Sequence, residues 1–234
     1  MTFTLDKIVP WGRSFDEYVA MFSLSKRDLA GSILGCGDGP ASFNSILTKR
    51  GARIISVDPL YRFSADEIKK RIHETYYDII EQTRANKTDF VWNNIRSVEE
   101  LGRIRMQAME EFLSDYEAGR KERRYMVADL PSLPFDDHAF ALAICSHFLF
   151  LYSEQLSEEF HVQSIKELCR VSKEARIFPL LELGAIKSRH LEPVIARIQD
   201  QGYRSEIISV PYEFQKGGNE MLTVTTIQQV QRNS

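Results

Sequence analysis

A glycine-rich loop between two apolar runs constrains the fold of this chain more than any other feature. The first run, residues 32–34, enters a loop with Gly35, Gly37 and Gly39, and the second run, residues 53–57, ends at Asp58. Glycines at this spacing let the backbone turn sharply after a strand and approach a ligand without side-chain clashes. An acid at the end of the next strand can accept hydrogen bonds from both hydroxyls of a ribose. The pattern therefore predicts parallel strands and a nucleoside-containing cofactor, although a turn without a ligand would have the same glycines.

The spacing of the glycines indicates which cofactor to expect. Dinucleotide-binding loops have a glycine where this chain has Pro40. The pattern Gly35-x-Gly37-x-Gly39 resembles motif I of the class I S-adenosylmethionine-dependent methyltransferases, whose loop packs against the methionine moiety. A nicotinamide-dependent short-chain oxidoreductase would need G-x-x-x-G-x-G directly after its first strand. That spacing is met only by Gly31, Gly35 and Gly37, and Gly31 comes before the apolar run instead of after it, so this class is disfavoured.

Two further motifs extend the resemblance. The run from Asp129 to Phe140 resembles the D-x-x-x-L-P-F-x-D-x-x-F segment of small-molecule methyltransferases similar to the ubiquinone and menaquinone biosynthesis enzymes. Residues 167–171, Glu-Leu-Cys-Arg-Val, resemble the end of the helix before their fifth strand. The resemblance covers about residues 30–60 and 125–230. It implies an α/β fold with a doubly wound, mostly parallel seven-stranded sheet and an antiparallel hairpin at its carboxyl-terminal edge.

The resemblance also implies the site residues and the cofactor, S-adenosyl-L-methionine, with S-adenosyl-L-homocysteine as product. Asp58 would bind the ribose, Asp129 and Leu130 the adenine, and the glycine loop the methionine portion. The residues expected at the cofactor are Arg13, Gly35, Cys36, Gly37, Asp38, Gly39, Asp58, Pro59, Asp129, Leu130, Cys145 and Ser146. His147, next to them at the end of the fourth strand, is the candidate general base, because its intrinsic pKa suits proton transfer near neutral pH. A packed, hydrogen-bonded histidine is the alternative interpretation.

The chain departs from the family at one informative position. The family usually has an acid two residues before the first glycine, which helps to hold the methionine amino group, and Ile33 stands there instead. Asp38 or Arg13 is the candidate replacement. Two alternatives to a small-molecule methyltransferase therefore stay open: a non-catalytic cofactor-binding module of the same fold, and, with less support, an RNA methyltransferase, since residues 120–124 form a short basic run.

Composition limits the kinds of binding partner and the cellular compartment that we expect. The 234 residues carry a formal net charge of −3, which does not favour nucleic acid or an anionic membrane as a partner. Three well-separated cysteines favour a reducing compartment, and the five histidines lack the spacing of metal ligands, so no metal site is expected. With no signal pattern or membrane-spanning apolar run, we expect a cytoplasmic protein that acts on a small molecule, with a homodimer left open.

The order of the predicted elements gives the domain organisation. We expect strands at residues 32–34, 53–57, 125–128, 139–145, 176–181, 206–210 and 222–227, with a short glycine loop at residues 217–219 between the last two. Apolar residues at helical spacing after Ser14 predict an amphipathic helix, with Glu17 at the capping-box position. Strands and helices alternate along the chain except in residues 62–124, which are rich in charge and show helical apolar spacing. We expect one methyltransferase domain with an amino-terminal helical cap, residues 1–30, and a helical insertion, residues 62–124. Because the insertion follows the strand that ends at Asp58, we expect it to lie over the cofactor pocket as a lid or substrate region.

Overall fold

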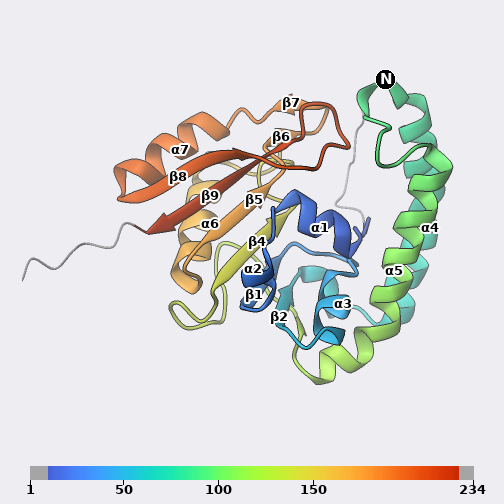
Figure 1. Cartoon of the computed structure of the whole chain (residues 1–234), viewed down its shortest axis with the longest axis horizontal. Coiled ribbons are helices and arrows are strands. Elements are labelled where there is room, and N and C mark those ends of the chain that lie inside the picture. Colours follow the sequence, from blue (N-terminus) through green and yellow to red (C-terminus); the bar gives the residue numbers. More distant parts are fainter. Residues whose placement is uncertain (1–9, 227–234) are drawn as a thin grey trace, which may run out of the picture.

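The computed structural model describes residues 10–226, and its centre is a seven-stranded sheet. The strand order is β3-β2-β1-β4-β5-β9-β8, with the first five strands parallel and β8 and β9 antiparallel at one edge (Figure 1). The strands are β1 (Ser32–Cys36), β2 (Arg53–Val57), β3 (Tyr125–Met126), β4 (Leu142–Ser146), β5 (Ala175–Phe178), β8 (Tyr203–Ser209) and β9 (Glu220–Thr226). This topology confirms the predicted fold class.

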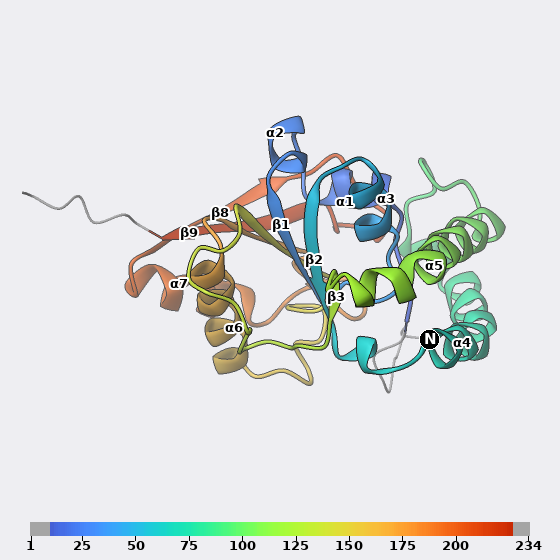
Figure 2. The ribbon, with the colours of Figure 1, turned by 90° about the horizontal axis from the view of Figure 1, so that it is seen from below.

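Helices cover both faces of the sheet, as a doubly wound fold requires (Figure 2). One face packs against α1 (Phe15–Met21), α2 (Lys26–Leu29) and α3 (Phe43–Lys49), and the other against α6 (Glu158–Val171) and α7 (Leu191–Asp200). The amphipathic helix predicted after residue 14 is α1, and its Ser14 and Glu17 form the expected capping box. The parallel strands are thus buried on both faces, which explains their continuous apolar runs.

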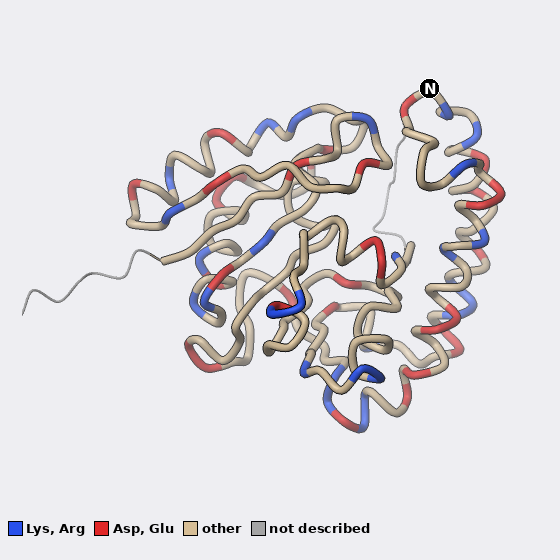
Figure 3. Tube along the Cα trace, viewed as in Figure 1, with Lys and Arg blue, Asp and Glu red and all other residues tan. Residues whose placement is uncertain are grey.

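Two long helices, α4 (Ala65–Ala85) and α5 (Val98–Lys121), fill most of the predicted insertion and lie side by side (Figure 1). They follow the short 3-10 helix η1 (Pro59–Arg62), and a second one, η2 (Lys87–Asp89), lies between them. Their buried side chains pack with Tyr61 and Tyr125 beside the β3 edge. Acidic and basic residues alternate along the rest of both helices (Figure 3), so their other faces suit water.

Several element boundaries differ from those the sequence predicts. The predicted third strand, residues 125–128, ends at Met126, because only two residues of β2 pair with it. The fourth strand begins at Leu142 instead of residue 139, since the chain before it meets the sheet only through a bridge between Phe140 and Ser172. The fifth strand ends at Phe178, where Pro179 has no N–H to continue the ladder. The predicted last strand reaches Ile227, which lies outside the described residues.

Three features of the fold were not predicted from the sequence. The helix α2 is one, and a small separate hairpin of β6 (Leu181–Glu182) and β7 (Ile186–Lys187) is the second. The third is the length of the connection between β8 and β9, which spans residues 210–219 rather than a tight glycine turn. The hairpin and this connection both reach the candidate site.

Candidate cofactor site

A cavity opens at the carboxyl ends of the parallel strands, where open α/β sheets bind ligands. The sheet contributes the loop after β1, Asp58 after β2, Ser146 and His147 at the end of β4, and Phe178 at the end of β5. The insertion contributes Ile79, Thr83, Asp89, Phe90, Leu101 and Arg105, and the amino-terminal segment contributes Trp11, Arg13 and Tyr18. The connection between β8 and β9 completes the lining with Tyr212, Phe214, Gln215 and Gly218.

The glycine loop is folded around the carboxyl group of Asp38. A Cβ atom added at Gly35 would lie 1.9 Å from Asp38 Oδ2, so a side chain at Gly35 would displace this carboxyl group. Gly37 has a φ of +68°, and an added Cβ there would lie 2.9 Å from Phe148 Cβ. Gly39 has a φ of +54° and open space around its Cα. These three positions therefore need glycine to shape the loop itself.

Asp38 is a buried acid at the edge of the cavity. The Tyr18 hydroxyl donates to its Oδ1 at 3.0 Å, and the Ser56 hydroxyl donates to its Oδ2 at 2.6 Å. Burial raises the pKa of Asp38 to about 7; the charge of Asp58 adds to this effect, while the two hydrogen bonds oppose it. Asp38 is thus poised to gain or lose its proton near neutral pH.

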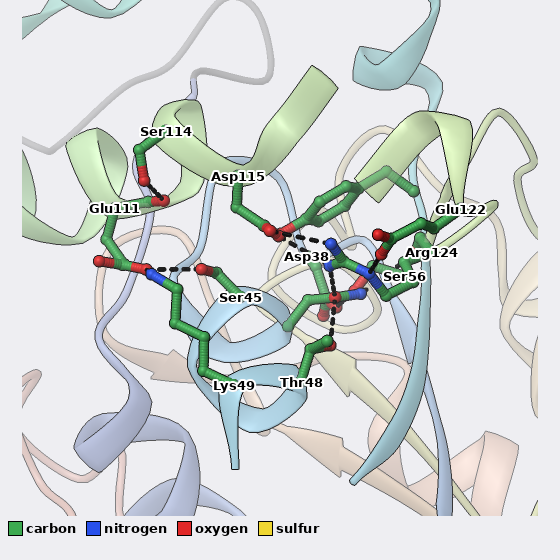
Figure 4. Close-up of polar contacts among 12 residues, drawn as sticks. Asp38, Ser45, Thr48, Lys49, Ser56, Glu111, Ser114, Asp115, Glu122 and Arg124 are labelled. Carbon is green, nitrogen blue, oxygen red and sulfur yellow. Dashed lines mark hydrogen bonds and ion pairs between the residues drawn. The ribbon is translucent and has the colours of Figure 1, made fainter. Parts of the chain in front are cut away.

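A polar network fixes Ser56 and, through it, Asp38 (Figure 4). Asn44 on α3 donates to Ser56 Oγ at 3.1 Å and accepts from Arg124 Nη1 at 2.9 Å. Arg124 forms a two-pronged ion pair with Asp115 on α5, at 2.7 and 2.8 Å. The insertion is therefore tied to the strand that carries Asp58 and to the loop that carries Asp38.

The Asp58 carboxylate holds the glycine loop to the end of β2. Its Oδ2 accepts a hydrogen bond from the Gly39 N–H at 2.8 Å, and its Oδ1 accepts one from the Leu60 N–H at 2.7 Å. Each carboxylate oxygen can accept a second hydrogen bond. The side chain, which lines the cavity, can therefore bind two ligand hydroxyls while it keeps the loop in place.

His147 lies at the end of β4 beside Ser146, and both line the cavity. The His147 Nδ1 atom is 3.0 Å from Ser146 Oγ, and its backbone N–H donates to the Phe178 carbonyl oxygen at 2.7 Å. Burial, together with the positive charges of Arg13 and Arg105, lowers the pKa of His147 well below its ordinary value. The imidazole is therefore neutral at pH 7, with a nitrogen that can accept a proton but only as a weak base.

Folding brings together about half of the residues expected at the site. Those that line the cavity are Arg13, Gly37, Asp38, Gly39, Asp58, Ser146 and His147. Gly35, Cys36, Pro59, Asp129, Leu130 and Cys145 are not part of the cavity lining. The side chains of Cys36, Cys145 and Leu130 pack in the core, so only their backbones are available to a ligand. Asp129 is exposed, close enough to Asp58 for its charge to raise the pKa of that residue.

Several lining residues were not identified from the sequence. One sequence signal could have identified Arg105: it is a charged residue on the apolar stripe of its helix, which also carries Leu101, Met109 and Phe112. In the structure Arg105 is 1% exposed. Tyr18 packs in the core and also lines the cavity. Tyr212 and Phe214 lie in a connection whose course depends on long-range contacts, and no local pattern marks them.

Comparison with known proteins identifies one relative in sequence. The chain is 36% identical to the uncharacterized protein MJ0045 of Methanocaldococcus jannaschii over 214 residues, which are 91% of this chain and 94% of that protein. The chain belongs to the family of MJ0045. No family model matches it.

Solved structures with a similar arrangement of helices and strands include methyltransferases. One is magnesium protoporphyrin IX methyltransferase from Synechocystis, with S-adenosylmethionine bound (14% identity, 91% of this chain and 78% of that one, TM-score 0.45). Another is a TehB-like methyltransferase from Corynebacterium glutamicum (13% identity, 92% and 88%, TM-score 0.46). Because these likenesses are distant, the function is argued below from this chain's own residues.

Two features are absent from residues 10–226, a cluster of metal ligands and a membrane-spanning helix. In this part of the chain, no three His, Cys, Asp or Glu side chains come together as metal ligands. No helix within it has both the length and the apolar character needed to cross a membrane.

Proposed function

We propose that this protein transfers a methyl group from S-adenosyl-L-methionine to a small-molecule acceptor. One observation carries the proposal: the glycine loop, Asp58 and the end of β4, which the sequence motifs single out separately, line one cavity at the carboxyl edge of the sheet. The topology of the sheet is the one that the motif resemblance implies.

The residues present fit this cofactor. We assign the ribose to Asp58, whose oxygens each have one remaining acceptor position, and the methionine portion to the open backbone at Gly39 and the neighbouring Gly37. Asp38 would pair with the methionine ammonium group in place of the acid that is missing at position 33. Asp129 and the Leu130 backbone, outside the cavity lining, would reach the adenine at its edge, and the backbones of Gly35, Cys36, Pro59 and Cys145 would support these contacts.

The chemistry needs alignment more than acid or base catalysis. The bound cofactor supplies a methyl group on a sulfonium, which is already activated for in-line displacement. The protein must align the acceptor and exclude water, and Trp11, Leu151, Phe178 and Phe214 give the cavity apolar surface for this. We assign to His147 the role of accepting a proton from an acceptor that must lose one, a role its neutral imidazole permits.

Enclosure of the cavity favours a small acceptor over RNA. The lining comes from the sheet, both insertion helices and the connection between β8 and β9, which surround the end of β4. A nucleotide chain would need an open, basic approach, and the net charge of the protein is −3.

Isothermal titration with S-adenosylhomocysteine tests the proposal. We expect the wild type to bind and Asp58→Ala to bind about 10- to 100-fold more weakly, a loss of ~1.5–3 kcal/mol, because the ribose loses its acceptor. Asp78→Ala, an exposed site on α4, should bind as the wild type does. Thermal unfolding must accompany the titration, since Asp58 also holds Gly39 and Leu60.

The outcomes test three claims separately: the role of Asp58, the binding of the cofactor, and methyl transfer. If folded Asp58→Ala keeps wild-type affinity, the ribose assignment is wrong. If the wild type binds neither S-adenosylmethionine nor S-adenosylhomocysteine, the proposed function is wrong. Binding without label transfer from methyl-labelled cofactor into any small molecule of a cell extract would favour the non-catalytic module.

A further inference from the structure

Two arginines contribute to the wall of the cavity, and the proposed reaction does not use their charge. Arg13 comes from the amino-terminal segment and Arg105 from α5, and both line the cavity. The Nε atoms of both are buried, and neither has a hydrogen-bond partner among the residues that the structure describes. Arg13 donates to the Trp11 carbonyl oxygen at 3.1 Å.

Within the described part of the chain, the carboxylate of Glu17 is the counter-ion available to these two guanidinium groups. Arg105 forms an ion pair with Glu17. The Glu17 oxygens also accept hydrogen bonds from the Tyr212 hydroxyl at 2.9 Å and from the Ser14 N–H at 2.9 Å. The Glu17 oxygens are therefore occupied, and the charge of Arg13, a partly buried side chain, has no counter-ion among the described residues. The other acid on this side of the cavity, Asp89, is exposed.

The charges of both arginines act on His147 at the end of β4. Arg13 and Arg105 are the two charges that lower the pKa of His147. The charge that raises the pKa of Asp38, after burial, is that of Asp58, and the charges that act on Asp58, after burial, are those of Arg62 and Asp129. The cavity thus has an acidic side at the glycine loop and a basic side next to His147.

A buried guanidinium without a counter-ion is unfavourable, and a bound anion would relieve the cost. The flat fork of an arginine matches a carboxylate, to which it can donate two parallel hydrogen bonds. The cavity that the two arginines line also has aromatic and aliphatic side chains, among them Trp11, Phe90, Leu101 and Phe214.

We propose that Arg13 and Arg105 form a subsite for the carboxylate of the acceptor, and that the acceptor is a small organic acid with an apolar body. This inference rests on the proposed function, because it places the acceptor next to the methyl donor. It makes Arg13 a specificity residue for the acceptor rather than a ligand of the cofactor.

The first experiment compares carboxylates with neutral isosteres. Benzoate, phenylacetate and 3-phenylpropionate are each titrated against the corresponding amide by ligand-observed NMR, with the wild-type protein alone and saturated with S-adenosylhomocysteine. We expect at least one acid to bind ten times more tightly than its amide. If no acid of the panel is preferred over its amide, the inference is overturned.

Variants of the arginines test whether the preference arises at this subsite. Arg13→Gln should reduce the preference for the acid about tenfold and raise the melting temperature of the free protein, because it removes a partly buried charge that has no counter-ion among the described residues. Arg105→Lys, which keeps a positive charge beside Glu17, should reduce the preference as well. Arg103→Gln, an exposed arginine on the same helix, is the control and should change neither quantity.

The cofactor's own carboxylate is the competing occupant. If the arginines held it, Arg13→Gln would weaken S-adenosylhomocysteine at least tenfold but leave 5′-methylthioadenosine, which lacks the amino-acid portion, unchanged. That result would overturn the assignment to the acceptor. Failure of the wild type to bind S-adenosylhomocysteine would instead refute the proposed function, while the acid-against-amide comparison on the free protein would still decide the subsite.

Discussion

At the residue scale, we expect Asp38 to connect protonation to cofactor binding. Its pKa of about 7 means that the carboxyl group is largely protonated at pH 6 and largely ionised at pH 8. The ammonium group that we assign to it would favour the ionised form, so binding should release a proton. We therefore expect the affinity for S-adenosylhomocysteine to rise about tenfold from pH 6 to pH 8. Titration calorimetry in buffers of different ionisation enthalpy measures both the affinity and the proton.

Asp38→Asn serves as the matched variant for this prediction. An amide keeps an oxygen that can accept from Tyr18 or Ser56 but does not titrate, so the rise in affinity between pH 6 and pH 8 should disappear. An equal pH dependence in Asp38→Asn and the wild type would assign the proton to another group. His147 is not that group in this range, because its lowered pKa keeps it neutral.

At the scale of elements, residues 89–91, which lie between α4 and α5, are hydrogen-bonded to the connection between β8 and β9. The Val91 N–H donates to the Phe214 carbonyl oxygen at 2.7 Å, and the Lys216 N–H donates to the Asp89 carbonyl oxygen at 2.9 Å. The rings of Phe90 and Phe214 stack at 4.9 Å between centroids. Because both segments line the cavity, we propose that this contact closes it and opens to admit ligands.

Hydrogen exchange at the closing contact tests this lid. The amides of Val91 and Lys216 should exchange more slowly once S-adenosylhomocysteine is bound, because the ligand holds both segments closed. Phe214→Ala removes the stacked ring and should speed their exchange several-fold in the free protein. Tyr77→Ala, which removes an exposed ring from α4, is the control. Identical exchange with and without ligand would contradict a lid that moves.

How far the sequence predicts these elements depends on the range of their contacts. The glycine loop, Asp58 and the capping box of α1 follow from local patterns, because turn geometry and strand order need only neighbouring residues. The Arg105–Glu17 pair joins residues far apart in the chain, so no local pattern predicts it. The β6–β7 hairpin depends on where β5 ends, which local patterns do not fix either. The site is therefore predictable on the sheet side and not on the acceptor side.

At the scale of the whole molecule, the insertion is part of the same cooperative structure as the sheet. Ile68, Ile72, Met109 and Phe112 form one buried cluster with Tyr61 and Tyr125, which connects α4 and α5 to the β2 and β3 side of the sheet. Polar contacts add to this packing: Glu111 accepts from Ser45 on α3 at 2.5 Å, and Asp115 is paired with Arg124 (Figure 4). The insertion should therefore unfold together with the sheet.

Cofactor binding should consequently stabilise the entire chain in a single step. A ligand at 100 times its dissociation constant stabilises the folded state by about 2.7 kcal/mol, which for a chain of this length corresponds to a rise of roughly 5–10 °C in melting temperature. Calorimetry with and without S-adenosylhomocysteine measures this shift and the number of transitions. One transition that moves as a whole is expected, because the cavity is lined by the sheet, the insertion and the β8–β9 connection together. Two transitions, of which only one responds to the ligand, would instead show that α4 and α5 fold as a separate unit and that the cavity does not couple them to the sheet.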